Sequence, residues 1–170
     1  MIDGRLTMLG MIARHGTVTA AAEALHYSPS TVSHQVKQLA KDLGVELLEQ
    51  RGRHVRLTPA ATTLLEHVDV MAAEWERARA DLDAYVDSTS GTLTLCGFST
   101  AASVLLPNAM RAMNEEFPQL ATHTIEAEPS RCYDLVLAGD ADLGVIVVTS
   151  STPPQSEGRF SHHFLIDDPL

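Results

Sequence analysis

One short stretch of the sequence brings hydroxyl, imidazole and ammonium groups together. Ser30, His34, Lys37 and Lys41 recur at intervals of four, three and four residues. At about 100° per residue these side chains fall on one face of a helix, which Ser33 and Gln38 flank. Groups of these kinds form hydrogen bonds with base edges and bind phosphates. The pattern therefore predicts recognition of nucleic acid by residues 28–43.

The opposite face of the same helix is apolar. Its members are Val32, Val36, Leu39 and Leu43. An apolar stripe of this spacing packs against a core. Ser28 is a suitable N-cap, Pro29 suits the first helical position, and Gly44 suits the residue after the last turn.

Two further helices and a basic hairpin complete this unit. Residues 2–15 predict a first helix, and a short alanine-rich helix follows with Thr19 as its N-cap. After Gly44, Val55 and Leu57 alternate with polar residues, which is typical of a strand. Gly52 allows the chain to reverse before it. Arginines 51, 53 and 56 give the hairpin a charge that suits the phosphate backbone. The alternative is a small helical core whose polar face is only solvated.

Residues 1–87 resemble the N-terminal part of a LysR-type transcriptional regulator. The resemblance rests on residues 20–25, 28–36, 39, 43–45 and 51–59. Leu48 and Ala61 depart from it, because the family usually has phenylalanine and glycine there. The resemblance implies a winged helix-turn-helix that binds double-stranded DNA, with these candidate contacts: Thr19, Ser30, Thr31, Ser33, His34, Gln35, Lys37, Arg51, Arg53 and Arg56.

A long helix follows Thr58-Pro59 and is expected to reach about Asp87. Its apolar residues repeat every 3.5 positions, which predicts the seam of a coiled coil. The seam consists of Leu64, Val68, Met71, Trp75, Ala78, Leu82 and Tyr85. The resemblance implies that this linker helix pairs two subunits, so that two heads meet a roughly palindromic site. The alternative is that the C-terminal part of the chain folds back onto the seam.

After a hinge at residues 88–91 the pattern changes to strands alternating with helices. Strands are expected from Thr92 to Cys96, over 120–127 and over 143–148, with helices over 99–117 and 129–138 between them. The last strand is almost wholly apolar, which predicts that both of its faces are covered. The order βαβαβ predicts a parallel sheet.

This second part resembles the start of the LysR effector domain, which looks like a two-lobed periplasmic binding protein. The chain stops where the first lobe would lead into the second, so an incomplete lobe with an open sheet edge is expected. The sequence thus predicts a multidomain α and α/β protein: a winged helix-turn-helix (1–58), a linker helix (59–88) and a partial effector-binding domain (89–170).

Parallel sheets bind ligands beyond the carboxyl ends of their strands. Ser99 and Thr100 follow the first strand of the lobe, and Thr149 follows the third. Hydroxyls and free N–H groups at a helix start suit a small anionic inducer. The alternative is that Ser99 is only a helix cap.

The net charge of −10 over 170 residues is unevenly distributed. Residues 1–58 carry a net charge of +2 and residues 59–170 one of −12. Screening limits each field to about 8–10 Å, so the basic part can still approach DNA. No apolar run approaches the length of a membrane span and no secretion signal is evident, which predicts a cytoplasmic protein.

Other chemistry finds little support in the sequence. Cys96 and Cys132 are expected to be structural thiols, and His162-His163 to be part of an ordinary surface strand. No metal-ligand spacing, phosphate loop or nucleophile–base pair is evident, so neither a cofactor nor an enzyme is expected. The prediction is a regulator that acts as a homo-oligomer, a dimer or a tetramer. The alternative is a truncated interaction protein that pairs with full-length regulators and modulates them.

Overall fold

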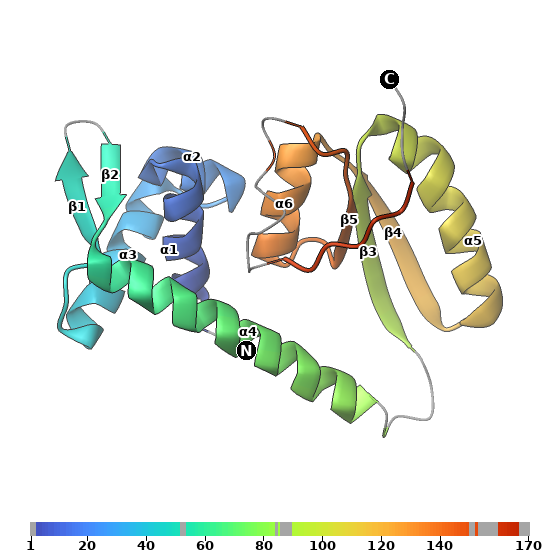
Figure 1. Cartoon of the computed structure of the whole chain (residues 1–170), viewed down its shortest axis with the longest axis horizontal. Coiled ribbons are helices and arrows are strands. Elements are labelled where there is room, and N and C mark those ends of the chain that lie inside the picture. Colours follow the sequence, from blue (N-terminus) through green and yellow to red (C-terminus); the bar gives the residue numbers. More distant parts are fainter. Residues whose placement is uncertain are drawn as a thin grey trace.

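The computed structural model of the chain describes residues 3–51, 54–83, 85, 90–149, 152 and 160–166. It has three parts in chain order: a helical head with a two-stranded hairpin, the long helix α4, and an α/β lobe (Figure 1). The lobe returns to the head through a contact between α1 and α6. This arrangement confirms the predicted fold class.

Three helices form the head: α1 (Gly4–His15), α2 (Val18–Ala24) and α3 (Pro29–Leu43). The expected cap of α2 was wrong. The hydroxyl of Thr17, not that of Thr19, accepts a hydrogen bond from the backbone N–H of Ala20, at 3.2 Å. Thr17 has the extended backbone of an N-cap residue, whereas Thr19 already lies in the first turn of the helix and is exposed.

The ends of α3 are as predicted. The Ser28 hydroxyl accepts a hydrogen bond from the N–H of Thr31, and Gly44 ends the helix with a φ of 70°. Three members of the apolar stripe are buried: Val32, Val36 and Leu39. Leu43, the expected fourth member, is exposed, because the last turn of α3 lies at the edge of the head beside Arg5.

The hairpin consists of β1 (Leu48–Arg51) and β2 (His54–Leu57), which pair antiparallel. Val55 and Leu57 are half-buried against the head core, whereas Arg56 between them is exposed. This alternation agrees with the predicted strand. We call residues 48–57 the wing.

The helix α4 (Pro59–Asp83) begins after Thr58, whose hydroxyl accepts a hydrogen bond from the N–H of Ala61. The same hydroxyl donates to the carbonyl of Glu46, so the start of α4 is tied to the segment before the wing. Residues 84 and 86–87, where the helix was expected to continue, lie outside the described residues, and Tyr85 lies in a turn.

The lobe contains a three-stranded parallel sheet in the order β4-β3-β5. Its elements are β3 (Gly91–Gly97), the π-helical turn η1 (Ala101–Leu105), α5 (Leu106–Glu116), β4 (Leu120–Glu126), α6 (Pro129–Ala138) and β5 (Leu143–Val145). This order confirms the predicted βαβαβ unit.

The third strand of the lobe is shorter and less covered than predicted. β5 ends at Val145 rather than at Val148, and Leu143 and Val148 are exposed. β5 pairs only with β3, and the final pair joins Gly97 to Val145. Because β3 ends at Gly97, residues 146–148 have no neighbouring strand to pair with, and the apolar run continues without forming a strand.

Candidate nucleic-acid interface

The polar face of α3 is open to solvent over its whole length. We call Ser30, His34, Lys37 and Lys41, all of which are exposed, the recognition face. Ser33, Gln35 and Gln38 are half-buried at its borders. Because Val32, Val36 and Leu39 anchor the opposite side in the core, the helix presents this face in one fixed orientation.

The N-terminal end of the recognition face is ordered by hydroxyl groups. The Ser28 oxygen lies 2.8 Å from the Ser30 hydroxyl and 2.8 Å from the Thr31 hydroxyl. A hydroxyl has one donor and two acceptor sites, so each of these groups keeps capacity for a further hydrogen bond. The cap therefore pre-orients the side chains that would approach a base edge.

One carboxylate, Asp42, borders the recognition face, and Arg5 of α1 neutralises it. Arg5 Nη1 donates to Asp42 Oδ2 at 2.6 Å, and Gln38 Nε2 donates to Oδ1 at 2.8 Å. These two hydrogen bonds, the one from Arg5 first, hold the pKa of Asp42 below its usual range. Lys37 and Lys41 form no ion pair with any residue in the described part of the chain. The face is therefore electrostatically positive despite the acidity of the whole protein.

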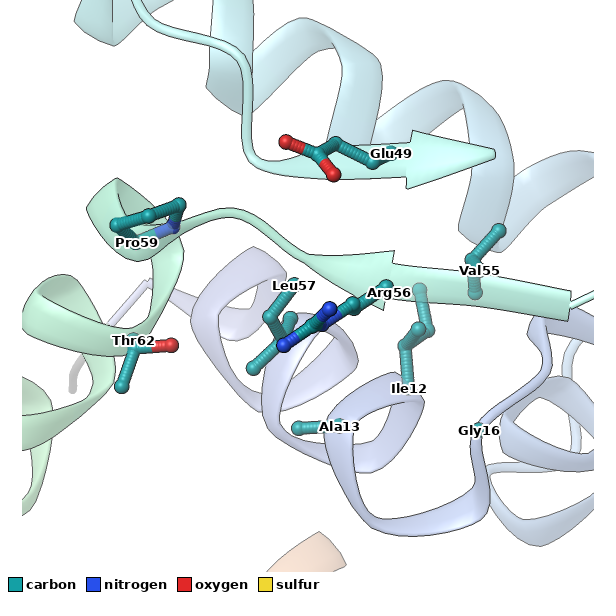
Figure 2. Close-up of a pocket in the computed structure, with 9 residues that line it drawn as sticks. All are labelled: Ile12, Ala13, Gly16, Glu49, Val55, Arg56, Leu57, Pro59 and Thr62. Carbon is teal, nitrogen blue, oxygen red and sulfur yellow. The ribbon is translucent and has the colours of Figure 1, made fainter. Parts of the chain in front are cut away.

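The wing contributes Arg56 beside an open pocket. Arg56 lies opposite Glu49 in the antiparallel pair, yet within the described ranges its side chain forms no hydrogen bond or ion pair. Figure 2 shows Arg56 over a pocket of about 520 Å³ between the wing, α1 and the start of α4. The guanidinium group is thus available to an external anion.

Three further residues were predicted to contact DNA: Arg51, Arg53 and Thr19. Arg51 ends β1, and Arg53 lies outside the described residues. Thr19 is exposed on α2. Among the described residues, then, the structure brings the α3 side chains together on one surface, with Arg56 on the neighbouring wing.

Two family models match the chain, one on each side of α4. Residues 4–62 match the bacterial regulatory helix-turn-helix protein of the lysR family, and residues 87–170 match the LysR substrate binding domain. The chain belongs to the LysR family of regulators. This membership agrees with the expectation that the chain is not an enzyme.

Similar helix-turn-helix transcriptional regulators are known from several bacteria. The regulator CysB of Haemophilus influenzae is 29% identical over 129 residues, which cover 75% of this chain and 40% of that protein. The regulator cbl of Escherichia coli K12 is 30% identical over 160 residues, or 90% of this chain and 51% of that protein. The chain thus spans about half the length of these relatives.

A solved structure of the Corynebacterium glutamicum OxyR C206 mutant aligns with a TM-score of 0.49 and 28% identity, over 88% of this chain and 46% of that chain.

The candidate inducer-binding residues lie beyond the carboxyl ends of β3 and β5. β3 and β5 are parallel, so the segments that follow them emerge on the same side. Ser99 and Thr100 are exposed just before η1, and their carbonyls accept hydrogen bonds from the Ser103 hydroxyl. Thr149 is exposed after β5, and its carbonyl accepts a hydrogen bond from Thr152. The π-helical turn was not predicted, since no residue pattern distinguishes it from an ordinary helix start.

The remaining candidate chemistry in the lobe is structural. Cys96 and Cys132 are free and buried. A hydrogen bond with Cys132 and burial raise the pKa of the Cys96 thiol, which keeps it protonated. In the described ranges no group of three or more histidine, cysteine or acidic residues could hold a metal ion. Nor is any of the helices there long and apolar enough to cross a membrane.

Proposed function

We propose that this LysR-type chain binds double-stranded DNA sequence-specifically through α3 and the wing. In this proposal it regulates transcription as a dimer or a tetramer, under the control of a small inducer. The observation that carries the proposal is the recognition face. Arg5 holds the neighbouring carboxylate, while Lys37 and Lys41 have no ion-pair partner among the residues that the structure describes. Such a surface lowers the repulsion between an acidic protein and a polyanion.

The side chains divide into two roles. The first turns of α3 enter the major groove, as recognition helices do. Residues that approach base edges are Ser30, Thr31, Ser33, His34 and Gln35. Residues that bind phosphates are Lys37, Arg51, Arg53 and Arg56, and Thr19 on α2 contacts the flanking backbone. A bidentate base contact gives roughly 1–3 kcal/mol of discrimination, whereas a phosphate contact acts on all sequences alike.

Pairing of subunits through α4 places two heads at a fixed separation. Four seam residues are exposed along α4 and just beyond it: Met71 by 47%, Trp75 by 44%, Leu82 by 63% and Tyr85 by 87%. Ala78 between them is also exposed, whereas Leu64 and Val68 are half-buried against the head core. The pairing surface therefore extends from Met71 to Tyr85. Two heads joined in this way match a two-part, roughly palindromic operator.

The signal is a small anion bound beyond the carboxyl ends of the lobe strands. Ser99 and Thr100 offer hydroxyl and N–H groups at the start of a helix, and Thr149 lies on the same edge. We place the protein in the cytoplasm, where chromosomal DNA is accessible.

Selection of bound sequences from random duplex DNA tests the proposal. The full chain is expected to enrich one roughly palindromic motif and to bind it less tightly as the salt concentration rises. Lys37→Ala should weaken binding, whereas Arg111→Ala, which removes one positive charge from α5, should not. Failure to enrich any motif, or tighter binding at higher salt, would contradict the proposal.

An interaction protein is the second candidate, and the exposed seam of α4 favours it. A chain of this length could pair with a full-length relative through Met71 to Tyr85 and modulate it. Mixing the two proteins and looking for heterodimers by native mass spectrometry distinguishes the candidates. Heterodimers without DNA binding by this chain alone would support the second candidate.

A further inference from the structure

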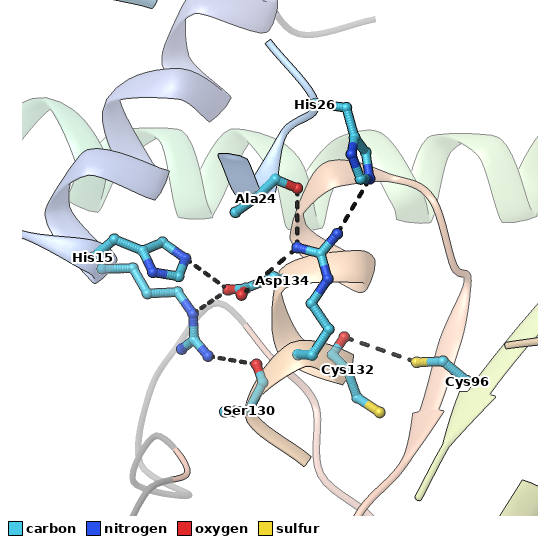
Figure 3. A network of polar contacts seen from close by, with 9 residues as sticks. His15, Ala24, His26, Cys96, Ser130, Cys132 and Asp134 are labelled. Atoms are coloured by element: carbon cyan, nitrogen blue, oxygen red, sulfur yellow. Dashed lines mark hydrogen bonds and ion pairs between the residues drawn. The ribbon is translucent and has the colours of Figure 1, made fainter. Parts of the chain in front are cut away.

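A polar contact joins the lobe to the head at the helix-turn-helix. Arg14 Nε of α1 lies 2.5 Å from Asp134 Oδ1 of α6, and Arg14 Nη2 donates to the carbonyl of Ser130 at 2.9 Å. His15 Nε2 lies 3.1 Å from the same Asp134 oxygen. Figure 3 shows Asp134 facing His15, with Ala24 and His26 of the head nearby.

This contact is largely shielded from water. The Arg14 side chain is 12% exposed and that of Asp134 is 7% exposed. Leu137, one turn further along α6, packs against the head core. Burial of an ion pair adds little net stability, but removing one partner leaves an uncompensated buried charge. The pair therefore fixes where α6 lies on the head more than it strengthens the fold.

A second arginine, Arg131 of α6, extends from this anchor to the turn between α2 and α3. Arg131 Nη1 donates to the carbonyl of Ala24 at 3.0 Å, and Arg131 Nη2 lies 3.2 Å from His26 Nε2. Ala24 is the last residue of α2, where carbonyl groups lack a partner within the helix. A guanidinium group can only donate, so His26 Nε2 is the acceptor.

The turn that Arg131 contacts has a constrained backbone. His26 has a φ of 57°, in the left-handed region that residues other than glycine adopt infrequently. Two residues later Ser28 caps α3, so the path of residues 25–27 sets how α3 follows α2. The Arg131 guanidinium thus bonds to the connection that orients the recognition face, and does so from another part of the chain.

We propose that Arg131 is a positioning residue of the recognition helix, supplied by the effector lobe and held in place by the Arg14–Asp134 pair. The inference rests on the proposed function and names its regulation: movement of α6 away from the head withdraws the donor from the turn and loosens the base contacts of α3. The part of the affinity that does not depend on DNA sequence comes from the cationic side chains of the recognition face and the wing. The Arg131 contact therefore controls discrimination between DNA sequences rather than general binding.

The α6 contact also reaches the segment 160–166. The guanidinium carbon of Arg14 lies 5.4 Å from the centre of the Tyr133 ring, and the Tyr133 hydroxyl lies 3.2 Å from His162 Nε2. The rings of Tyr133 and Phe160 meet edge to face at 4.8 Å. A rearrangement of this segment therefore acts on the same helix that carries Arg131.

Amide hydrogen exchange of the full chain without DNA is the first test. Arg131→Ala should accelerate exchange at Leu25, His26 and Tyr27 about tenfold, as loss of a hydrogen bond from a charged group implies. Asp134→Asn keeps the shape of the anchor and should have a smaller effect of the same kind. Arg111→Ala removes the same charge from α5, where the Arg111 side chain donates to Asn108, and should leave the turn unchanged.

Two further measurements separate positioning from general stability. Arg131→Lys keeps the charge but cannot form both contacts, so it should restore little of the protection. In duplex binding, Arg131→Ala should lower the ratio of affinity for the selected motif over scrambled DNA about tenfold, while affinity for scrambled DNA stays the same. Unchanged exchange at the turn in a folded Arg131→Ala protein would overturn the inference. If Arg131→Ala alters exchange at the turn but the unchanged protein selects no DNA motif, the proposed function is refuted. The positioning role of Arg131 at the turn would still stand.

Discussion

Arg5, at the start of α1, and Asp42, near the end of α3, form an ion pair of 2.6 Å at the edge of the recognition face. Arg5 also binds Asp3 at 2.6 Å, so one guanidinium group holds two carboxylates. The hydrogen bonds to these carboxylates raise the pKa of Arg5 further above its usual value. A residue outside the helix-turn-helix thus sets the charge of the proposed DNA-binding surface.

Arg5→Ala should weaken binding to all duplexes. The substitution removes the hydrogen bond from Arg5 to the Asp42 carboxylate and leaves the one from Gln38. The negative charge of Asp42 then lies uncompensated beside the proposed phosphate contacts. We expect a loss of about twofold to fivefold, a small effect because the pair is exposed and screened by solvent. Fluorescence anisotropy with the selected motif measures it. Adding Asp42→Asn should restore binding, and a double variant as weak as Arg5→Ala alone would show that Asp42 is not the cause.

The same cluster should contribute to stability in a defined pH range. Hydrogen bonds to Arg5 lower the pKa of both Asp3 and Asp42. Carboxylates with a depressed folded pKa stabilise the protein above their unfolded pKa, and this contribution is lost as the pH falls through the folded pKa. The free energy of unfolding, measured with urea, should therefore fall below about pH 4. In Arg5→Ala this fall should be smaller. Identical pH profiles for the two proteins would exclude this role.

His34→Ala and Lys37→Ala should affect DNA binding differently. Both residues are exposed, but His34 lies nearer the N-terminal turns of α3, which we propose approach base edges. Loss of His34 should relax preference at one or two positions of the motif, by about tenfold for a contact of ~1.4 kcal/mol. Loss of Lys37 should weaken binding to all DNA sequences alike. Selection from random DNA measures both, and an unchanged motif would remove His34 from the base-contacting set.

Arg53→Ala and Arg56→Ala in the wing should each reduce affinity without changing the preferred bases. Each loss of one phosphate contact should lower the slope of log affinity against log salt by about 0.9. Glu49→Gln, at the cross-strand position of Arg56, should strengthen binding slightly because it removes a negative charge. Titrations at several salt concentrations give the slopes. A change in the preferred base would show that the wing contacts a groove.

Local signals made the head predictable from its sequence. Ser28, Pro29 and Gly44 fix both ends of α3, and the apolar stripe fixes its orientation, because each signal acts within a few residues. The errors also have local causes. Thr17 and Thr19 both resemble caps, and only the end of α1 at Gly16 determines which one serves.

Contacts between distant parts of the chain could not be predicted in this way. Arg131 and Ala24 are 107 residues apart in the sequence, and nothing near either residue indicates the other. The length of β5 depends on where β3 ends, which is a property of the pair and not of the apolar run at residues 143–148. For the same reason, no sequence signal near Arg5 indicated its bond to Asp42.

The exposed seam of α4 gives the last prediction. Trp75 and Leu82 lie on the apolar side of the helix and leave large surfaces in water, which a second copy would cover. Leu82→Glu should convert the dimer to a monomer in sedimentation velocity without unfolding the chain, because Leu82 is outside both hydrophobic clusters. Glu74→Gln, which alters an exposed residue of α4 that pairs with Arg77, is the matched control. The monomer should then bind a single half-site as well as before but lose the gain from two joined half-sites, because the second head no longer binds at a raised effective concentration. A Leu82→Glu protein that remains dimeric would mean that subunits pair through another surface.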